Sequence, residues 1–137
     1  MSKITLFLDS NIFIEFFKEN EKVIEIFNFI LKESDKVKIC INAIVWSEVV
    51  YQLCIKRDFP KTDVFEFLNN FTKLSINSDV IKIAEYAIDN GLFTNDSLNY
   101  ATYYYYNLHY FVSVDNDFEK LEEIKLINNI SQLKEIL

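Results

Sequence analysis

Short apolar runs that favour β-strands alternate along this chain with longer stretches of helical periodicity. The apolar runs are residues 4–8, 37–41, 74–76, 110–114 and 125–127. Between them, apolar residues recur at the three- and four-residue spacing of amphipathic helices, over about 11–17, 21–32, 43–56, 60–71, 79–88 and 94–108. Ser131 is placed to cap a last helix. Such alternation favours an α/β fold with a mostly parallel sheet that helices cover on both faces.

Turn-forming residues are scarce, which narrows the fold class further. Glycine and proline each occur once in 137 residues. A β-sandwich or β-barrel needs many tight turns and therefore many such residues, so we exclude both. The length suits one hydrophobic core. We therefore predict a single α/β domain over residues 1–137.

Four acidic residues stand at places that a parallel sheet brings toward one edge. Asp9 and Asp115 end strands, and Glu48 lies in the early part of the helix after the second strand. Strand ends and the starts of the following helices share the edge at which such folds bind ligands. Topology alone does not bring Asp96 there. A helix from Asp96 to about residue 108 is about 20 Å long at ~1.5 Å per residue, and the next strand returns only part of that distance.

Converging carboxylates would raise one another's pKa, and a divalent cation would relieve that repulsion. Oxygen ligands select hard ions such as Mg²⁺ or Mn²⁺, which activate water and stabilise charge on a phosphodiester. Taken singly, Asp96 fits a helix-capping role better than a ligand role. Glu48 is more informative, because it interrupts an apolar helix in which a charge needs a partner or a metal.

Four segments resemble the four motifs of PIN domains, in order and spacing, over nearly the whole chain. They are residues 8–14, 44–51, 95–101 and 112–118. The first delivers Asp9 from a strand, followed by a small residue, Asn11 and apolar residues. The second is a helical Glu amid apolar residues, the third is an Asp that opens a helix, and the fourth is hydroxyl-x-Asp-x-Asp-Phe after a strand. Asn99 and Tyr100 depart from the third motif, which often continues with small residues.

The resemblance implies a three-layer α/β/α sandwich and a metal-dependent endoribonuclease, most similar in size and layout to the VapC toxins of toxin–antitoxin pairs. RNA phosphodiester bonds would be cleaved by metal-activated water. The residues implied to bind Mg²⁺ or Mn²⁺ and to carry out catalysis are Asp9, Glu48, Asp96 and Asp115. Asp117 would be an auxiliary acid, while Asn11 and Ser113 would hold the acids through hydrogen bonds. The resemblance also implies an antitoxin whose basic segment fits the acidic cleft, and we expect a homodimer.

The net charge of −7 conflicts with simple nucleic-acid binding, in which contacts to phosphates dominate the affinity. Bound divalent ions would make an acidic site attractive to a phosphate, because they bring positive charge to it. Basic residues are thinly spread, and tight basic pairs are usually solvated surface. As a hypothesis, Lys18, Lys56 and Arg57 flank the acidic edge, with Lys56 and Arg57 as the RNA phosphate contacts.

Several other features fit a soluble cytoplasmic protein. Cys40 and Cys54 lie in apolar runs, so we predict buried free thiols and a reducing compartment. The uncharged stretch 97–114 contains polar residues and has acidic flanks, so we reject a membrane helix. The tyrosine run 103–106 fits core packing plus a dimer surface better than stacking on RNA bases, although the second interpretation stays open.

Two other functions fit part of the pattern. Phosphatases and phosphotransferases of the haloacid-dehalogenase type also begin with a strand that ends in Asp. That chemistry needs a second acid two residues later, and this chain has Asn11 there. A non-enzymatic PIN-like module that binds a basic partner would keep the acids as remnants. Failure to bind any divalent ion would favour this second alternative.

Overall fold

A sheet of five parallel strands forms the centre of the protein. The computed structural model describes residues 2–137, and within them the strand order is β3–β2–β1–β4–β5. The strands are β1 (Ile4–Leu8), β2 (Val37–Ile41), β3 (Thr72–Lys73), β4 (Tyr110–Val112) and β5 (Leu126–Ile127). Every neighbouring pair is parallel. The predicted α/β class with a short parallel sheet is therefore confirmed.

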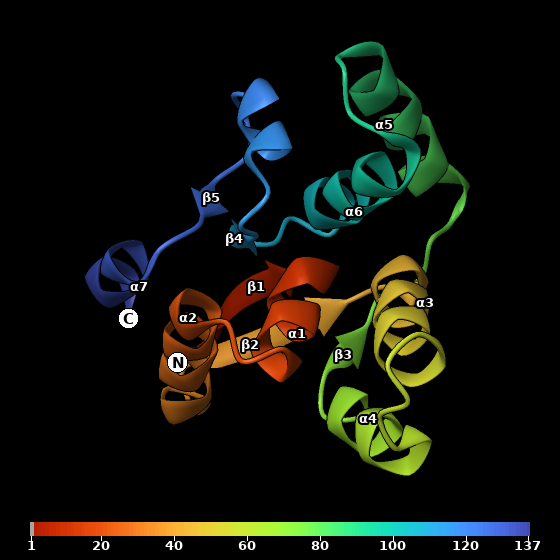
Figure 1. The fold of residues 1–137 in the computed structure, drawn as a ribbon. Coiled ribbons are helices and arrows are strands. Elements are labelled where there is room, and N and C mark those ends of the chain that lie inside the picture. Colours follow the sequence, from red (N-terminus) through yellow and green to blue (C-terminus); the bar gives the residue numbers. More distant parts are fainter. Residues whose placement is uncertain (1) are drawn as a thin grey trace.

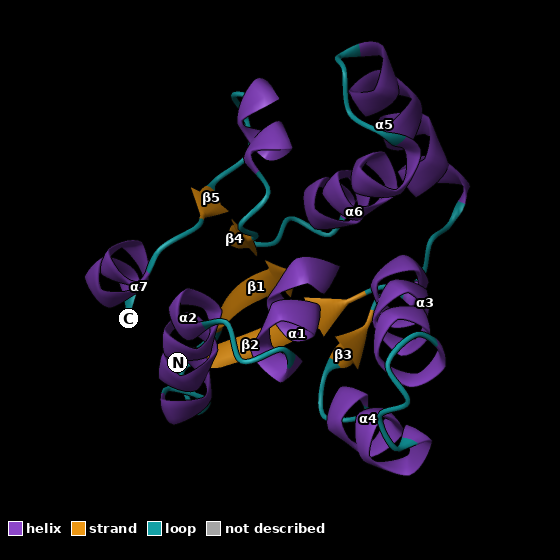
Figure 2. Cartoon of the chain, viewed as in Figure 1, coloured by secondary structure: helices purple, strands orange, loops and turns teal. Residues whose placement is uncertain are grey.

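Helices cover both faces of this sheet (Figures 1 and 2). The helices that follow β1 and β2 lie on one face: α1 (Ser10–Phe17), α2 (Glu21–Lys32), α3 (Ala43–Val50) and α4 (Lys61–Leu68). The other face is covered by α5 (Ser78–Asp89) and α6 (Thr94–Tyr105). The last helix, α7 (Ile130–Ile136), packs beside α2. The arrangement is the predicted three-layer α/β/α sandwich.

The direction in which strands are added reverses between β1 and β4. From β1 the chain moves outward to β2 and β3, then crosses the sheet through α5 and α6 to reach β4 on the other side of β1. In open α/β sheets, ligands bind outside the carboxyl ends of the strands at such a reversal. Asp9 directly follows β1, and its backbone N–H donates to the carbonyl oxygen of Val112 at the end of β4, at 3.0 Å. The fold therefore predicts a site at these two strand ends.

The central strand β1 is buried on both faces, and this burial fixes its register in the sheet. Leu6, Phe7 and Leu8 have no exposed surface. Phe7 stacks on Phe111 of β4 with ring centroids 5.2 Å apart, and Phe111 packs on Phe118 at 4.4 Å. Side chains buried on both sides of a parallel strand leave no freedom of register, since a one-residue slip would exchange its two faces.

Several predicted boundaries were wrong. The strand predicted over 110–114 ends at Val112, and the helix predicted over 94–108 ends at Tyr105. The third strand is Thr72–Lys73 and not residues 74–76, because Ile76 packs against α5 and α6 instead, beside Val80, Ala84 and Ala101. The last helix is capped by Asn129, whose side chain accepts from the Gln132 backbone N–H, and not by Ser131. The helix predicted over 43–56 is present in two parts, since α3 continues as a π-helical turn, η1 (Tyr51–Ile55).

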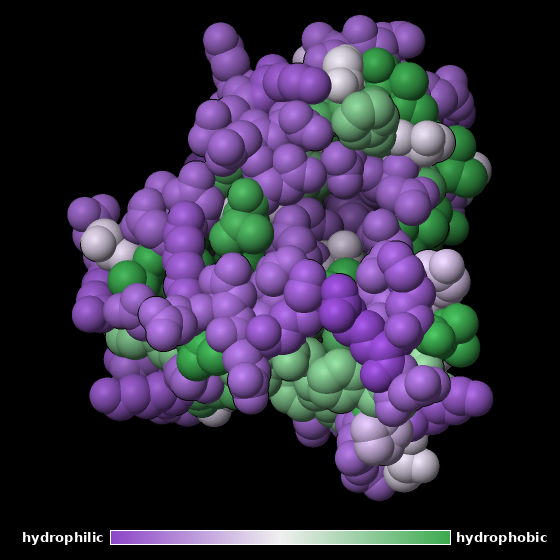
Figure 3. All heavy atoms as spheres, in the orientation of Figure 1, coloured by the Kyte–Doolittle hydropathy of each residue, from purple (hydrophilic) through white to green (hydrophobic). Residues whose placement is uncertain are grey.

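The predicted state of the two cysteines is confirmed. Cys40 and Cys54 are buried and free. No helix among the described residues combines the length and the apolar character that a membrane crossing requires. The face in Figure 3 is mostly hydrophilic, with apolar side chains gathered over the region of α5. Ile81 and Ile88 of this helix are 48% and 44% exposed.

Candidate metal centre

Asp9 is the most buried carboxylate at the point where the strand order reverses, with 3% of its surface exposed. Its Oδ1 accepts hydrogen bonds from the Ser10 backbone N–H at 2.9 Å and from Asn99 Nδ2 at 3.0 Å. Its Oδ2 accepts from Asn11 Nδ2 at 3.0 Å and from the Ser113 hydroxyl at 2.9 Å. These donors come from α1, α6 and the segment after β4. The orientation of the carboxylate is therefore fixed by three parts of the chain.

A second layer of hydrogen bonds fastens the end of β4 to the start of α1. Asn11 Nδ2 also donates to Ser113 Oγ at 3.0 Å, and Asn11 Oδ1 accepts from the Val114 backbone N–H at 3.3 Å. Ser113 Oγ in turn accepts from the Asp115 backbone N–H at 3.0 Å. The network that holds Asp9 thus also sets the backbone from which Asp115 projects.

Three carboxylates meet next to this network. Asp96, Asp115 and Asp117 each present one oxygen, and these oxygens lie within 4.8 Å of one another. All three residues are half-buried. Asp115 also caps the short helix η2 (Asn116–Lys120), since its Oδ1 accepts from the Asp117 backbone N–H at 2.9 Å. Asp96 and Asp115 belong to the predicted set of four, whereas Asp117 was predicted only as an auxiliary acid.

The position of Asp96 follows from the lengths of α6 and β4. Because α6 ends at Tyr105, the helix from Asp96 rises only about 14 Å at ~1.5 Å per residue. The extended path from Tyr110 to Asp115 covers about 16 Å at ~3.3 Å per residue. The two distances match, so the strand does return to the level at which the helix began.

Glu48 lies outside the group of three but beside it. Burial raises the pKa of Glu48, and the polar side chains of Ser10 and Asn95, at the starts of α1 and α6, lower it. The carboxylate of Glu48 on α3 therefore lies beside the starts of α1 and α6.

The electrostatic state of the site shows a shortage of positive charge. The pKa of Asp9 is raised to about 7, chiefly by burial and also by the charges of Asp96 and Glu48, against the hydrogen bond from Ser113. Burial also raises the pKa of Asp96 to about 6, together with the charges of Asp115 and Glu48. Among the described residues, Lys120 lowers the pKa of Asp96 and lies 3.7 Å from Asp117 Oδ1. One partly exposed lysine does not balance five acids.

The donor set fits a hard divalent cation. The side chains offer carboxylate oxygens, which Mg²⁺ and Mn²⁺ prefer. Two oxygens on opposite sides of a Mg²⁺ ion lie about 4.2 Å apart, since each Mg–O distance is ~2.1 Å. The 4.8 Å limit of the Asp96–Asp115–Asp117 group is close to that separation. A cation there would also relieve the charge repulsion that raises the pKa values of Asp9 and Asp96.

Two amide side chains at the site were missed by the sequence analysis. Asn99, which was noted only as bulkier than the motif expects, has no exposed surface and donates to Asp9. Asn95 lowers the pKa of Glu48 through its polar side chain. A signal for Asn99 was present in the sequence, because it lies three residues after Asp96 and so on the same side of α6. No comparable signal points to Asn95, since residues next to a motif acid are often solvated.

The basic residues proposed for RNA contact lie farther away. Lys56 and Arg57 are exposed and directly follow η1. Lys56 is about 12 Å beyond Glu48 along the helix axis at ~1.5 Å per residue. Lys18 is also exposed and pairs with Glu15 at 3.4 Å. A role in phosphate binding stays a prediction for these residues.

Comparisons with known proteins agree on the fold and on the family. The PIN domain family model matches residues 6–124 of the chain. Ribonuclease VapC6 of Methanocaldococcus jannaschii is 27% identical, over 93% of this chain and 99% of that protein.

Solved structures resemble the chain over most of its length. A toxin–antitoxin complex from Klebsiella pneumoniae matches with a TM-score of 0.73 and 16% identity, over 90% of this chain and 96% of that one. VapBC2 from Rickettsia felis, bound to a promoter DNA fragment, matches with a TM-score of 0.72 and 18% identity, over 92% and 99%. At this level of identity, the structural matches show a shared fold.

The raised carboxyl pKa values predict that stability without divalent ions falls as the pH rises. The pKa of Asp9 is about 7 in the folded protein and near 3.8 in the unfolded chain. Between pH 3.8 and pH 7 the folded state therefore binds more protons than the unfolded state. Stabilisation is complete below about pH 4 and is lost as the pH rises through 7. We expect the free energy of unfolding in urea to be about 2 kcal/mol higher at pH 5 than at pH 8.

Asp96→Asn should reduce this pH dependence, while Glu25→Gln, which removes an exposed charge from α2, should leave it intact. Wild-type stability that is equal at the two pH values would contradict the electrostatic description of the site.

Proposed function

Because the chain belongs to the PIN domain family, we propose that it is a Mg²⁺- or Mn²⁺-dependent endoribonuclease and the toxin of a toxin–antitoxin pair. The observation that carries this proposal is the group formed by Asp96, Asp115 and Asp117, next to buried Asp9 at the carboxyl ends of β1 and β4. The relative named Ribonuclease VapC6 and the toxin–antitoxin structures with the same fold support it.

The proposal assigns a role to each of the five acids at the site. Asp9, Glu48, Asp96 and Asp115 would hold the ion, and the position of Asp117 adds it to this set. When bound, the ion supplies positive charge to the phosphodiester and makes water a better nucleophile. The arrangement explains how a chain of net charge −7 meets a polyanion, since the charge that attracts RNA is brought by the cation.

The residues around Asp9 act by orientation. Asn11, Asn99 and Ser113 present N–H and O–H groups to both of its oxygens, so the lone pairs that remain point in fixed directions. A preorganised carboxylate binds a ligand without first losing conformational freedom. Residues that hold metal ligands in this way commonly affect metal affinity by about 10- to 100-fold.

The first test removes single acids. Asp9→Asn and Asp96→Asn should each lower Mg²⁺- or Mn²⁺-dependent cleavage of a structured RNA by at least about 100-fold, because each removes a carboxylate from the ion site. The measurement is the single-turnover cleavage rate of a labelled RNA.

Glu25→Gln is the matched control, since it neutralises an exposed acid far from the strand ends and should cleave at the wild-type rate. Wild-type rates in both Asp9→Asn and Asp96→Asn would trace the cleavage to a contaminating nuclease. Wild-type protein that binds no divalent ion in calorimetry would instead favour a non-enzymatic module that binds a basic partner.

The second test concerns the predicted phosphate contacts. Reversing both charges in Lys56→Glu/Arg57→Glu should weaken RNA binding and lower the slope of log affinity against log salt by about two. Binding is measured with Asp96→Asn as the background, so that RNA is not cut. The control Lys22→Glu/Lys134→Glu makes the same charge change at exposed positions of α2 and α7. Equal RNA affinity in the two double variants would remove Lys56 and Arg57 from the site.

Protein partners complete the proposal. An antitoxin with a basic segment suits the acidic site, and a homodimer would cover exposed apolar side chains such as those of Ile81 and Ile88. Light scattering of the purified chain should give twice the monomer mass of 16.3 kDa. A monomer mass at micromolar concentration would exclude the homodimer and leave the antitoxin as the partner for this surface.

A further inference from the structure

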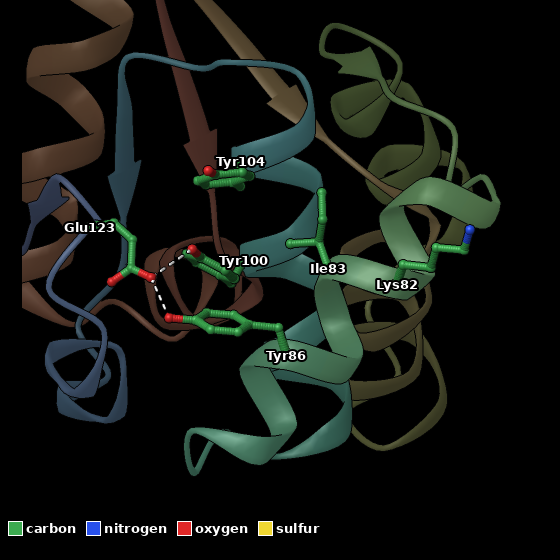
Figure 4. Close-up of a pocket in the computed structure, with 6 residues that line it drawn as sticks. All are labelled: Lys82, Ile83, Tyr86, Tyr100, Tyr104 and Glu123. Atoms are coloured by element: carbon green, nitrogen blue, oxygen red, sulfur yellow. Dashed lines mark hydrogen bonds between the residues drawn. The ribbon is translucent and has the colours of Figure 1, made fainter.

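A pocket with three tyrosines in its wall lies between α5, α6 and the segment that follows η2, and none of the acids of the candidate metal centre lines it (Figure 4). Its volume is about 370 Å³, within the range of small-ligand sites. The lining residues are Lys82, Ile83, Tyr86, Tyr100, Tyr104 and Glu123. Walls of aromatic and apolar side chains with one carboxylate and one lysine make this pocket chemically different from the oxygen-rich site at the strand ends.

The tyrosines present both ring surface and hydroxyl groups to the pocket. Tyr86 and Tyr104 are 49% and 51% exposed, so their rings are accessible, whereas Tyr100, which lies between them, is buried. The rings of Tyr100 and Tyr104 lie 5.9 Å apart and are tilted by 35°. Figure 4 shows the three rings one above another along the pocket. Such π faces attract cations through their quadrupole.

Glu123 is held at the edge of these rings as a fixed negative charge. The Tyr86 hydroxyl donates to Glu123 Oε1 at 2.9 Å, and the Tyr100 hydroxyl donates to the same oxygen at 3.5 Å. A hydrogen bond from its own backbone N–H and the one from Tyr86 lower the pKa of Glu123. Lys82 does not neutralise it, because its ammonium points away from the tyrosines in Figure 4. The carboxylate therefore stays available for a positively charged group.

We propose that this pocket binds an arginine side chain of a basic protein segment. A guanidinium group is planar, stacks on tyrosine rings and pairs with a carboxylate through its forked N–H groups, so one residue uses both features of the pocket. Charge complementarity favours this occupant, since the chain carries a net charge of −7 and Glu123 lies at the edge of the rings while the Lys82 ammonium points away. A nucleotide could stack on the same rings, but its base would leave the Glu123 carboxylate without a positively charged partner. The assignment does not depend on ribonuclease activity.

The test uses a small probe and no RNA. Acetyl-Gly-Arg-Gly-amide is titrated into the full chain, and the ring signals of Tyr86 and Tyr104 are followed by NMR. The peptide in which citrulline replaces arginine keeps the shape of the side chain without its charge. We expect millimolar binding of the arginine peptide that shifts both rings, and binding of the citrulline peptide that is about 5- to 10-fold weaker.

Matched variants locate the interaction. Glu123→Gln and Tyr104→Leu should each weaken binding of the arginine peptide about fivefold, and both positions are exposed enough for the variants to fold. Glu122→Gln changes the same charge at the adjacent exposed residue, which does not line the pocket, and should bind like the wild type. Backbone amide spectra verify that each variant is folded.

Three results would overturn the proposal. The first is equal affinity for the arginine and citrulline peptides, and the second is unchanged affinity in folded Glu123→Gln. The third is a shift of the tyrosine rings by guanosine 5′-monophosphate but not by the arginine peptide, which would make the pocket a nucleobase site. Because the ring signals are local, arginine binding at the separate acid cluster would not imitate the expected result.

Discussion

The site depends on a carboxylate buried where two parallel strands end. Asp9 has almost no exposed surface, yet four donors from three parts of the chain reach its two oxygens. A buried charge is costly unless it is paired and hydrogen-bonded, so the surrounding polar groups and the fold specify one another. The same network holds the backbone after β4, and through Ser113 it sets the position of Asp115. Asp9 therefore joins the architecture of the sheet to the geometry of the acids.

Hydrogen bonds orient the acids but do not balance their charges. Asp9 and Asp96 have raised pKa values because burial and neighbouring carboxylates disfavour ionisation, and Lys120 offsets this only in part. Sites that accumulate like charges in this way commonly have a function, because stability alone would select against them. We propose that a divalent cation would resolve this imbalance and would supply the positive charge that the proposed activity requires at a phosphodiester. The tyrosine pocket, in contrast, combines one carboxylate with aromatic rings and so suits an organic cation.

The acids near strand ends could be predicted from the sequence, because the change from apolar to polar residues indicates where a buried strand stops. Asp9 and Asp115 follow such strands, and parallel topology brings their ends together. The position of Asp96 could not be predicted without the length of α6. This helix ends at Tyr105 and not near residue 108, and the shorter helix lets its first turn lie level with the end of the strand. Asn99 and Asn95 became visible only in three dimensions, because their partners Asp9 and Glu48 are distant in the sequence. The tyrosines of the run 103–106 also differ in environment, which the sequence does not show. Tyr103 is buried, whereas Tyr104 lines the pocket.

The most direct measurement of the central claim is an anomalous difference map from crystals of the protein grown with Mn²⁺. The account predicts a peak among the carboxylates of Asp96, Asp115 and Asp117, in contact with at least one more acid from Asp9 and Glu48. A Mn²⁺ ion bound elsewhere, with these carboxylates unliganded at an ion concentration that supports RNA cleavage, would contradict it.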